Sequence, residues 1–270
     1  MITVNGIAKA KGGLYQVKFS NQEKLVVSED QLVRHRLLKG MTLEEDEFVE
    51  IKKNTRYDLG LQEAYRYISY QLRSEKEVKQ FLKDKEIPYE ASQKIINQLK
   101  ELHLVDDLVF AESYVRTQMR LSDKGPRNLK QQLNKKGIAE EITLTALSLY
   151  QDEDQGAVAL RTAEKALRKI HGKSFKETQQ KIRQTLMQKG FEQTTIDWVM
   201  GELSLEKETA AETEALTREG DKVWRRHQRK PLRERKQKVK QSLYQKGFDL
   251  DAIQQYLEIK EVEDEERAME

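Results

Sequence analysis

The sequence contains no cysteine and only 3 prolines among its 270 residues. The absence of cysteine excludes disulfide bonds, thiolate metal ligands and a cysteine nucleophile. No stretch approaches the roughly 18 uncharged apolar residues of a membrane-spanning helix, and the first residues, MITVNGIAKAKGG, lack the apolar segment of a signal peptide. We therefore expect a cytoplasmic protein that does not enter a membrane.

Recognisable catalytic motifs are also missing. Gly12 and Gly13 precede strand-like residues, not a helix with a Lys-Ser or Lys-Thr pair, so they form no P-loop. Asp106 and Asp107 are better explained as helix caps than as a catalytic or metal-binding pair. The histidines are too far apart for a metal motif: they are His35, His103, His171 and His227. With no HExxH motif and no nucleophile elbow either, we expect a protein that is not an enzyme and needs no metal or cofactor.

Charge is abundant but segregated. Charged residues make up 35% of the chain and hydrophobic residues 37%, and the mean hydropathy of −0.83 favours a thin helical protein with many solvated faces. Acidic residues gather at positions 44–50 and 261–266, whereas basic residues are concentrated between Lys124 and Lys246. A basic stretch between acidic ends indicates a polyanionic partner, with nucleic acid as the first candidate.

The N-terminal segment differs from the rest because its apolar positions alternate. The alternating runs 15–19 and 25–27 predict a short antiparallel β-unit. Ser28 is expected to cap a helix that continues to Leu38, because its hydroxyl can accept from the amides of the first turn. Residues 48–51, with Phe48, Val49 and Ile51, are expected to return as another strand.

From about residue 58 the apolar period becomes helical, and a four-fold internal repeat follows. Each copy places two apolar residues four apart, then a stop position, then another apolar residue. The stop positions advance by 51, 53 and 57 residues (137 − 86, 190 − 137 and 247 − 190). They are Glu86, Gly137, Gly190 and Gly247. Glycine after an amphipathic stripe is typical of a left-handed helix end, so each copy predicts a helix, a stop and another helix.

With a preceding helix, each copy becomes a three-helix unit of roughly 50 residues, too small to be stable unless it stacks on its neighbours. We therefore expect a mostly α protein of tandem three-helix repeats that form an elongated curved rod, with a small N-terminal β-containing unit. The expected parts are that unit at 1–55, repeats at 56–103, 104–151, 152–206 and 207–260, and an acidic tail at 261–270.

The residues themselves resemble the RecX family of regulatory proteins, in the longer form of Gram-positive bacteria. The resemblance rests on the order and spacing of these segments: AYRYI at 64–68, LRSEKEV at 72–78, LKEL at 99–102, DDLVFAESYVR at 106–116, KGPR at 124–127 and LNKKGI at 133–138. It extends over residues 58 to about 260. Glu86 departs from the usual glycine, and Tyr70 with Gln71 replaces a basic position.

The resemblance implies a non-enzymatic modulator of the RecA recombinase. Such a protein lodges in the groove of the RecA filament on single-stranded DNA and limits filament growth, strand exchange and coprotease activity, in homologous recombination, DNA repair and the SOS response. We expect it to act as a monomer and to contact duplex DNA only without sequence specificity.

Two basic segments are the candidate contacts with RecA or DNA, because each neutralised phosphate releases condensed counterions. The first comprises Arg116, Lys124, Arg127, Lys130, Lys135 and Lys136, and the second Arg225, Arg226, Arg229, Lys230, Arg233 and Arg235. Trp224, beside the second segment, is expected to anchor its helix. Ser74 and Glu77 are expected to form a capping box that leaves Arg73 free to point outward as a further contact.

Two other readings stay open. Short three-helix units with basic helices also occur in helix-turn-helix transcription regulators, which would bind duplex DNA in a sequence-specific manner. A helical-repeat scaffold would instead bind a protein partner in a salt-insensitive manner, without nucleic acid.

Overall fold

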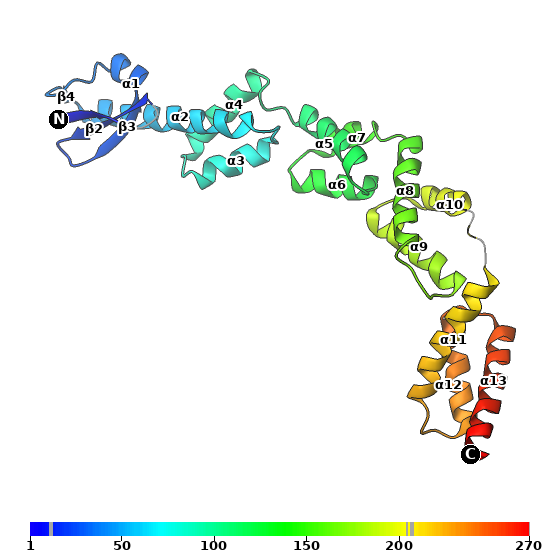
Figure 1. The fold of residues 1–270 in the computed structure, drawn as a ribbon. Coiled ribbons are helices and arrows are strands. Elements are labelled where there is room, and N and C mark those ends of the chain that lie inside the picture. Colours follow the sequence, from blue (N-terminus) through cyan, green and yellow to red (C-terminus); the bar gives the residue numbers. More distant parts are fainter. Residues whose placement is uncertain (11–12, 204, 206–207, 270) are drawn as a thin grey trace. The chain divides into compact units, whose positions relative to one another are not determined.

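The computed structural model describes residues 1–10, 13–203, 205 and 208–269 (Figure 1). Gly12 of the expected glycine turn and the expected boundary at 206–207 therefore lie outside the described residues. Thirteen helices and four strands are found in this part of the chain. The expectation of tandem helical repeats after a small N-terminal β-unit is confirmed.

The N-terminal unit is an antiparallel sheet of β1 (Ile2–Lys9), β2 (Leu14–Phe19), β3 (Lys24–Ser28) and β4 (Thr42–Leu43), in the order β3-β2-β1-β4. Val17, Phe19 and Val27, which the alternating pattern placed on one face, are buried in its core. α1 (Glu29–Arg34) follows, and Ser28 caps it as expected, its Oγ accepting from the Gln31 amide at 3.2 Å. The helix ends before the expected Leu38, because Arg36 adopts a left-handed conformation (φ 49°).

The strand expected at residues 48–51 is wrong. These residues belong to α2 (Glu45–Ser69), which begins with a capping box. The Glu44 side chain accepts from the Glu47 amide, and the Glu47 side chain accepts from the Glu44 amide. Phe48, Ile51 and Thr55 are buried on one helix face, whereas Val49 is exposed. The 25-residue helix also runs through the boundary expected between residues 55 and 56, so the β-unit and repeat 1 share one continuous helix.

Repeat 1 consists of α2, α3 (Glu75–Asp84) and α4 (Tyr89–Glu101). The remaining helices are α5 (Asp107–Leu121), α6 (Pro126–Lys135) and α7 (Glu140–Leu147); α8 (Asp152–Leu167), α9 (Phe175–Lys189) and α10 (Gln193–Glu202); and α11 (Thr209–Arg226), α12 (Leu232–Gln245) and α13 (Leu250–Met269). The segment expected as an acidic tail, as far as residue 269, continues α13.

The middle helix of every repeat ends at its stop position in the left-handed region. Gly137, Gly190 and Gly247 have φ values of 85°, 89° and 86°, which confirms the glycine stops. Glu86 adopts the same conformation (φ 56°) although it carries a side chain. The departure from glycine therefore does not abolish the first stop.

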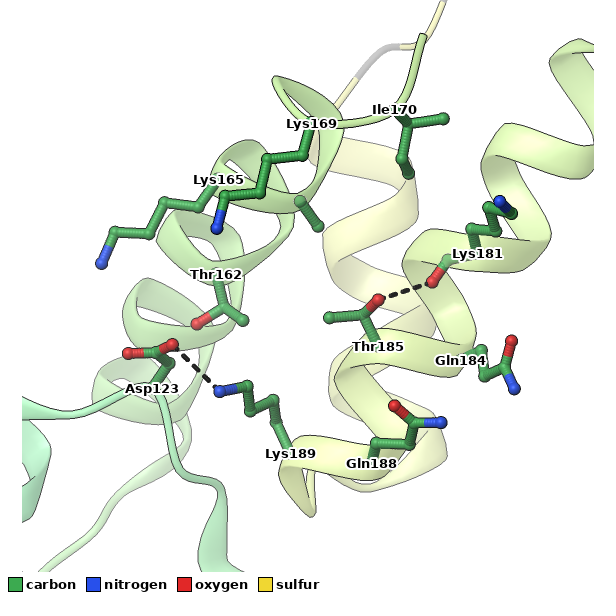
Figure 2. Close-up of a pocket in the computed structure, with 11 residues that line it drawn as sticks. Asp123, Thr162, Lys165, Lys169, Ile170, Lys181, Gln184, Thr185, Gln188 and Lys189 are labelled. Atoms are coloured by element: carbon green, nitrogen blue, oxygen red, sulfur yellow. Dashed lines mark hydrogen bonds and ion pairs between the residues drawn. The ribbon is translucent and has the colours of Figure 1, made fainter. Parts of the chain in front are cut away.

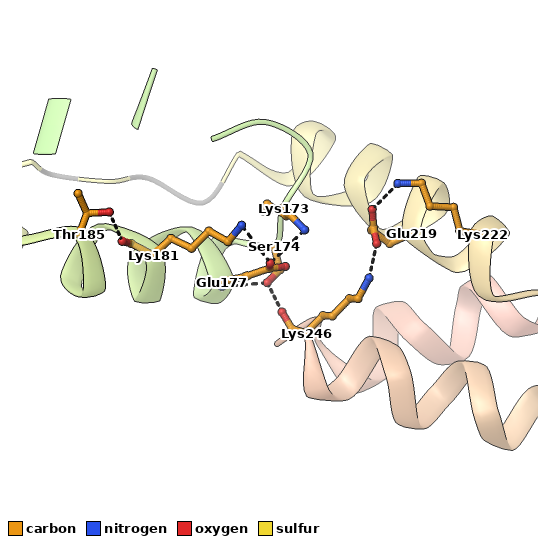
Figure 3. A network of polar contacts seen from close by, with 8 residues as sticks. All are labelled: Lys173, Ser174, Glu177, Lys181, Thr185, Glu219, Lys222 and Lys246. Carbon is orange, nitrogen blue, oxygen red and sulfur yellow. Dashed lines mark hydrogen bonds and ion pairs between the residues drawn. The ribbon is translucent and has the colours of Figure 1, made fainter. Parts of the chain in front are cut away.

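The hydroxyl of a helix N-cap joins one repeat to the next at two junctions. Ser74, the buried N-cap of α3, donates to the carbonyl of Lys136, directly before the stop glycine of α6, at 2.8 Å. Ser174, the buried N-cap of α9, donates to the carbonyl of Lys246, directly before the stop of α12 (Figure 3). Each serine also accepts from the amide three residues on, so one hydroxyl both caps a helix and joins two repeats.

The junction between α6 and α9 uses backbone atoms instead. The N–H of Gly125 donates to the carbonyl of Lys189 at 2.8 Å. A Cβ on Gly125 would approach the Gly190 backbone to 2.5 Å, so only glycine fits there. Pro126, at the first helical position, has no N–H and needs no cap.

Where the first helical residue does carry an N–H, the following repeat satisfies it. Asp107 on α5 accepts from the amide of Glu75 at 2.8 Å, and Glu212 on α11 accepts from that of Phe175 at 2.7 Å. Asp106 caps its own helix as expected, accepting from the amides two and three residues on at 2.8 and 3.1 Å. Asp107, expected to do the same, instead caps the helix of the neighbouring repeat.

The described residues form two compact units, Met1–Tyr114 with Gln132–Ala146, and Val115–Gln131 with Leu147–Glu270. Helices α5 and α6 contribute residues to both. The junction made by Ser74 lies within the first unit, and those made by Gly125 and Ser174 lie within the second.

Candidate nucleic-acid interface

The second basic segment spans the end of α11, a loop and the start of α12. Four of its arginines are exposed: Arg225, Arg226, Arg229 and Arg233. The Nε of Arg225 donates to the Asp221 carbonyl at 3.3 Å, and Lys230 pairs with Glu234 at 3.2 Å. The exposed guanidinium groups give this segment a positively charged surface that suits an anionic partner.

Arg235 does not belong to that surface. Its guanidinium lies over the Trp224 ring, 4.8 Å from the centroid, and pairs with Asp264 on α13. The Arg235 side chain is largely buried, and Trp224 is buried as well, which confirms the indole as an anchor. We therefore remove Arg235 from the candidate contacts, because it holds α12 against α11 and α13.

The first basic segment is divided between the two units. Arg116, Lys124, Arg127 and Lys130 lie in the second unit. Arg116 and Arg127 are exposed, and Arg127 is 3.7 Å from a carboxylate oxygen of Glu192. Lys124 is half-buried, and its Nζ donates to the Gln118 side chain at 3.1 Å. The exposed arginines are therefore better placed for an external anion than Lys124.

Lys135 and Lys136 lie in the first unit. Lys135 is exposed, and its carbonyl accepts from Lys76 at 2.9 Å. Lys136 pairs with Glu77 at 2.6 Å and lies over the Phe110 ring, 5.4 Å from its centroid. Burial would raise the pKa of Glu77, but hydrogen bonds from Lys136 and the Ser74 amide lower it below its usual value. Lys136 thus stabilises a repeat junction, and this internal pairing makes it a weaker candidate for the predicted contact with RecA or DNA.

The expectation that Arg73 points outward is also wrong. Its guanidinium lies over the Tyr67 ring, 4.1 Å from the centroid, and its Nε is buried without a hydrogen-bond partner. Ser74 and Glu77 do form the expected capping box. The cation–π contact holds Arg73 against α2.

A third basic surface was not predicted from the sequence. Lys165 on α8, Lys169 in the turn directly after α8, and Lys181 and Lys189 on α9 surround a hollow of about 380 Å³ (Figure 2). In the sequence Lys165 and Lys169 belong to a basic run at 165–176 that contains no acidic residue, and this run was not singled out as a candidate contact. That run was one available signal, and the spacing of eight residues between Lys181 and Lys189, which places both side chains near one face of α9, was another.

Two further classes of site can be addressed from the described residues. Within the described ranges, no three His, Cys, Asp or Glu side chains lie together as metal ligands would. Across the same part of the chain, no helix is long and apolar enough to cross a membrane.

The fold defines a class first: this is a tandem three-helix-repeat protein whose repeats are joined by helix-cap contacts. Residues 61–99 match the family description "RecX, first three-helix domain", and residues 106–147 match "RecX, second three-helix domain". Residues 152–200 and 210–257 both match "RecX, third three-helix domain". The chain therefore belongs to the RecX family.

Similar proteins support this membership over nearly the full length. "Regulatory protein RecX" of Enterococcus faecalis is 52% identical over 266 residues, covering 98% of this chain and 100% of that protein. The protein of the same name in Bacillus pumilus is 38% identical over 257 residues, covering 94% and 98%. A crystal structure of RecX from Lactobacillus salivarius is 42% identical with a TM-score of 0.53, covering 56% of this chain and 98% of that one.

Proposed function

We propose that this protein binds the RecA filament on single-stranded DNA and limits its ATPase, strand-exchange and coprotease activities without catalysing a reaction itself. Membership of a family whose relatives are named regulatory proteins carries the proposal. It acts in the cytoplasm as a monomer, and contact with single-stranded DNA adds to its affinity for the filament.

The contacts support this function physically. A filament of RecA on DNA is a repetitive target, and tandem repeats present related surfaces several times along one chain. The exposed arginines at the α11–α12 loop are the contacts we favour, because arginine binds both carboxylates and phosphates through its planar fork of donors. Arg116 and Arg127 are secondary candidates.

The test is RecA-catalysed ATP hydrolysis on single-stranded DNA, using RecA from Enterococcus faecalis with and without substoichiometric amounts of this protein. Inhibition well below one copy per RecA is expected, because a protein that caps or lodges in a filament affects many subunits. No effect at equimolar protein, with the chain shown to be folded, would refute the proposal and leave a scaffold or a transcription regulator to be tested.

A triple variant locates the contact. Arg226→Glu, Arg229→Glu and Arg233→Glu together should raise the concentration needed for half-inhibition by roughly tenfold or more, since three exposed charge contacts of about 0.5–1 kcal/mol each are replaced by repulsion. The matched control reverses three exposed lysines of the β-unit, Lys18, Lys24 and Lys39. It imposes the same change in net charge and should leave inhibition unchanged. Equal effects of both variants would mean that only net charge matters.

A further inference from the structure

The lysine-lined hollow between α8 and α9 holds more positive charge than its own carboxylates neutralise. Asp123 is the one carboxylate among its lining residues, and it pairs with Lys189 at 3.1 Å. Lys181 is 3.6 Å from Glu177, which also pairs with another lysine. Lys165, on α8, and Lys169, in the turn after it, make no ion pair with any described residue and lie on one side of the hollow (Figure 2). Asp123 also interacts electrostatically with Lys165, so a single lining carboxylate faces several lysines and the hollow keeps a net positive charge.

The floor of the hollow carries no charge. Thr162, buried on α8, donates its hydroxyl to the Val158 carbonyl at 2.7 Å, and Thr185 on α9 donates to the Lys181 carbonyl at 2.8 Å. Both hydroxyl protons are therefore already engaged in hydrogen bonds within their own helices. Only the lysines and the glutamine amides at the rim can bind an anion in this hollow.

Repeat 4 provides an internal comparison, because it matches the same family description as repeat 3. The two repeats correspond at a constant offset of 57 residues, the separation of their stop glycines (247 − 190) and of their N-caps (231 − 174). At this offset all four lysines of the hollow have basic counterparts: Lys222, Arg226, Lys238 and Lys246 correspond to Lys165, Lys169, Lys181 and Lys189. The basic set is therefore a shared feature of both repeats.

The repeats differ at the floor of this set. Thr162 corresponds to Glu219, whose buried carboxylate lies between Lys222 and Lys246 and pairs with both (Figure 3). Burial alone would raise the pKa of Glu219, but hydrogen bonds from the two lysines lower it to about 2. Repeat 4 thus contains an internal anion at the position where repeat 3 has a neutral threonine.

We propose that a phosphate group of a single DNA strand enters the hollow between α8 and α9 and takes the place that the Glu219 carboxylate occupies in repeat 4. This inference rests on the proposed function, because it assigns the DNA contact of the same protein to named residues. Lysine suits the role, because its ammonium group is a point charge with three donors that binds a tetrahedral phosphate without requiring a planar partner. The lysines are distributed over α8, the turn after it and α9, so they can follow a strand over more than one phosphate.

The first test installs the counterion of repeat 4. Thr162→Glu should weaken binding of a fluorescent oligothymidylate roughly tenfold, because the carboxylate would occupy the hollow and pair with Lys165 and Lys189. Thr162→Gln has nearly the same size without the charge and should bind almost as the parent protein does. Equal losses for both variants would mean that size rather than charge is responsible, which would overturn the proposal.

The second test avoids any change in the interior. Lys165→Gln with Lys169→Gln alters only exposed side chains, and the salt dependence of oligothymidylate binding then counts the lost phosphate contacts. The slope of log affinity against log salt should become shallower by about 1.4, since each contact on a single strand contributes about 0.7. An unchanged affinity and slope in the double variant would refute the site, even where Thr162→Glu fails to fold.

Competition separates the possible sources of the anion. Inorganic phosphate, ATP and polyglutamate are each added at equal ionic strength to the complex with oligothymidylate. We expect that none of them displaces the DNA at the concentrations at which unlabelled oligothymidylate displaces it. Displacement by ATP or phosphate would assign the hollow to a small phosphate ligand, and displacement by polyglutamate to an acidic protein segment, and either result would overturn the DNA assignment.

These measurements contain no RecA, so the inference and the proposed function can fail separately. Loss of DNA binding in the two variants together with no effect of the parent protein on RecA would retain the site and reject the proposed function. Inhibition of RecA by the parent protein together with no DNA binding, or with binding that the variants leave unchanged, would retain the function and reject the site.

Discussion

Replacing Ser174 tests whether the hydroxyl that caps α9 also stabilises the docking of the terminal repeat. Ser174→Ala removes two hydrogen bonds: one accepted from the Glu177 amide at 3.0 Å and one donated to the Lys246 carbonyl. Loss of an N-cap costs about 1 kcal/mol. A buried carbonyl left without a donor costs about 1–3 kcal/mol more. We therefore expect a total loss of about 2–4 kcal/mol.

Two further variants separate the cost of the lost cap from the cost of the lost hydrogen bond to the Lys246 carbonyl. Ser28→Ala removes an N-cap that accepts from the Gln31 amide at 3.2 Å, and Ser28 donates no hydrogen bond to a neighbouring repeat, so it should cost only about 1 kcal/mol. Ser174→Asp keeps a good cap but has no proton to donate to the Lys246 carbonyl when ionised. Ser174→Asp should therefore still destabilise the protein. If Ser174 acted only as a cap, the same variant would be neutral.

Native-state hydrogen exchange of the full chain is the suitable assay, because repeat proteins can open locally and a single unfolding midpoint would average over repeats. In Ser174→Ala, the amides of α12 should lose protection by roughly 30-fold or more, corresponding to about 2 kcal/mol. A loss no larger than that of Ser28→Ala in its own helix would refute the junction argument. So would full protection in Ser174→Asp.

Two other predictions concern the stops and the buried carboxylate. In urea unfolding, Gly137→Ala should destabilise the protein by about 2–4 kcal/mol, because φ is 85° and the new Cβ would lie 2.6 Å from Cδ of Lys76. Glu86→Gly should stabilise the protein by about 1 kcal/mol in the same assay, because glycine adopts the left-handed conformation without strain. Because the pKa of Glu219 is about 2 when folded and 4.5 in the unpaired reference, its contribution of up to about 3 kcal/mol is complete above pH 4.5 and is lost as the pH falls toward 2. Urea unfolding of Glu219→Gln should therefore show a weaker pH dependence between those values, and a parallel dependence in both proteins would contradict the assignment.

Local features could be predicted from the sequence because neighbouring residues determine them. The capping box of Ser74 and Glu77 and the cap formed by Asp106 each depend on fewer than five consecutive residues, and each glycine stop depends on a pattern of about ten residues. The period of apolar residues likewise gave the helices of each repeat. These features are fixed before any long-range contact forms, so a single sequence contains the necessary information.

The start of α2 could not be predicted in the same way. Phe48, Val49 and Ile51 are three apolar residues among four positions, a density that fits a buried strand as well as a helix. The structure resolves the ambiguity because Phe48 and Ile51 are buried on one helix face and Val49 is exposed. The deciding signal was the Glu44–Glu47 pair, which caps the helix with a glutamate instead of the commoner serine or threonine.

The site was the hardest part to predict, because a basic run does not reveal which of its members are neutralised inside the fold. Lys136 finds its carboxylate 59 residues earlier and Arg235 finds its own 29 residues later, and neither distance is visible as a local pattern. Conversely, Lys165 and Lys169 were not among the basic segments singled out from the sequence, yet neither makes an ion pair with a described residue. Charge density along a sequence and positive charge available to a ligand are therefore different quantities in this protein.

The ends of the array follow from the same junction chemistry. A further repeat after repeat 4 would need a donor at the N-cap of α12, where Pro231 offers neither a hydroxyl nor an N–H. At the glycine stops of α6 and α12 the preceding repeat packs so closely that a Cβ on the glycine would lie 2.7 and 2.8 Å from the Cβ of Lys76 and Lys176. A further repeat before repeat 1 would need the same space at the stop of α3. Glu86 carries such a Cβ, and its carbonyl already accepts from Arg56 at 3.3 Å. Glutamate is therefore tolerated at the first stop because no preceding repeat docks there, and both terminal repeats lack the features that would join a second chain end to end.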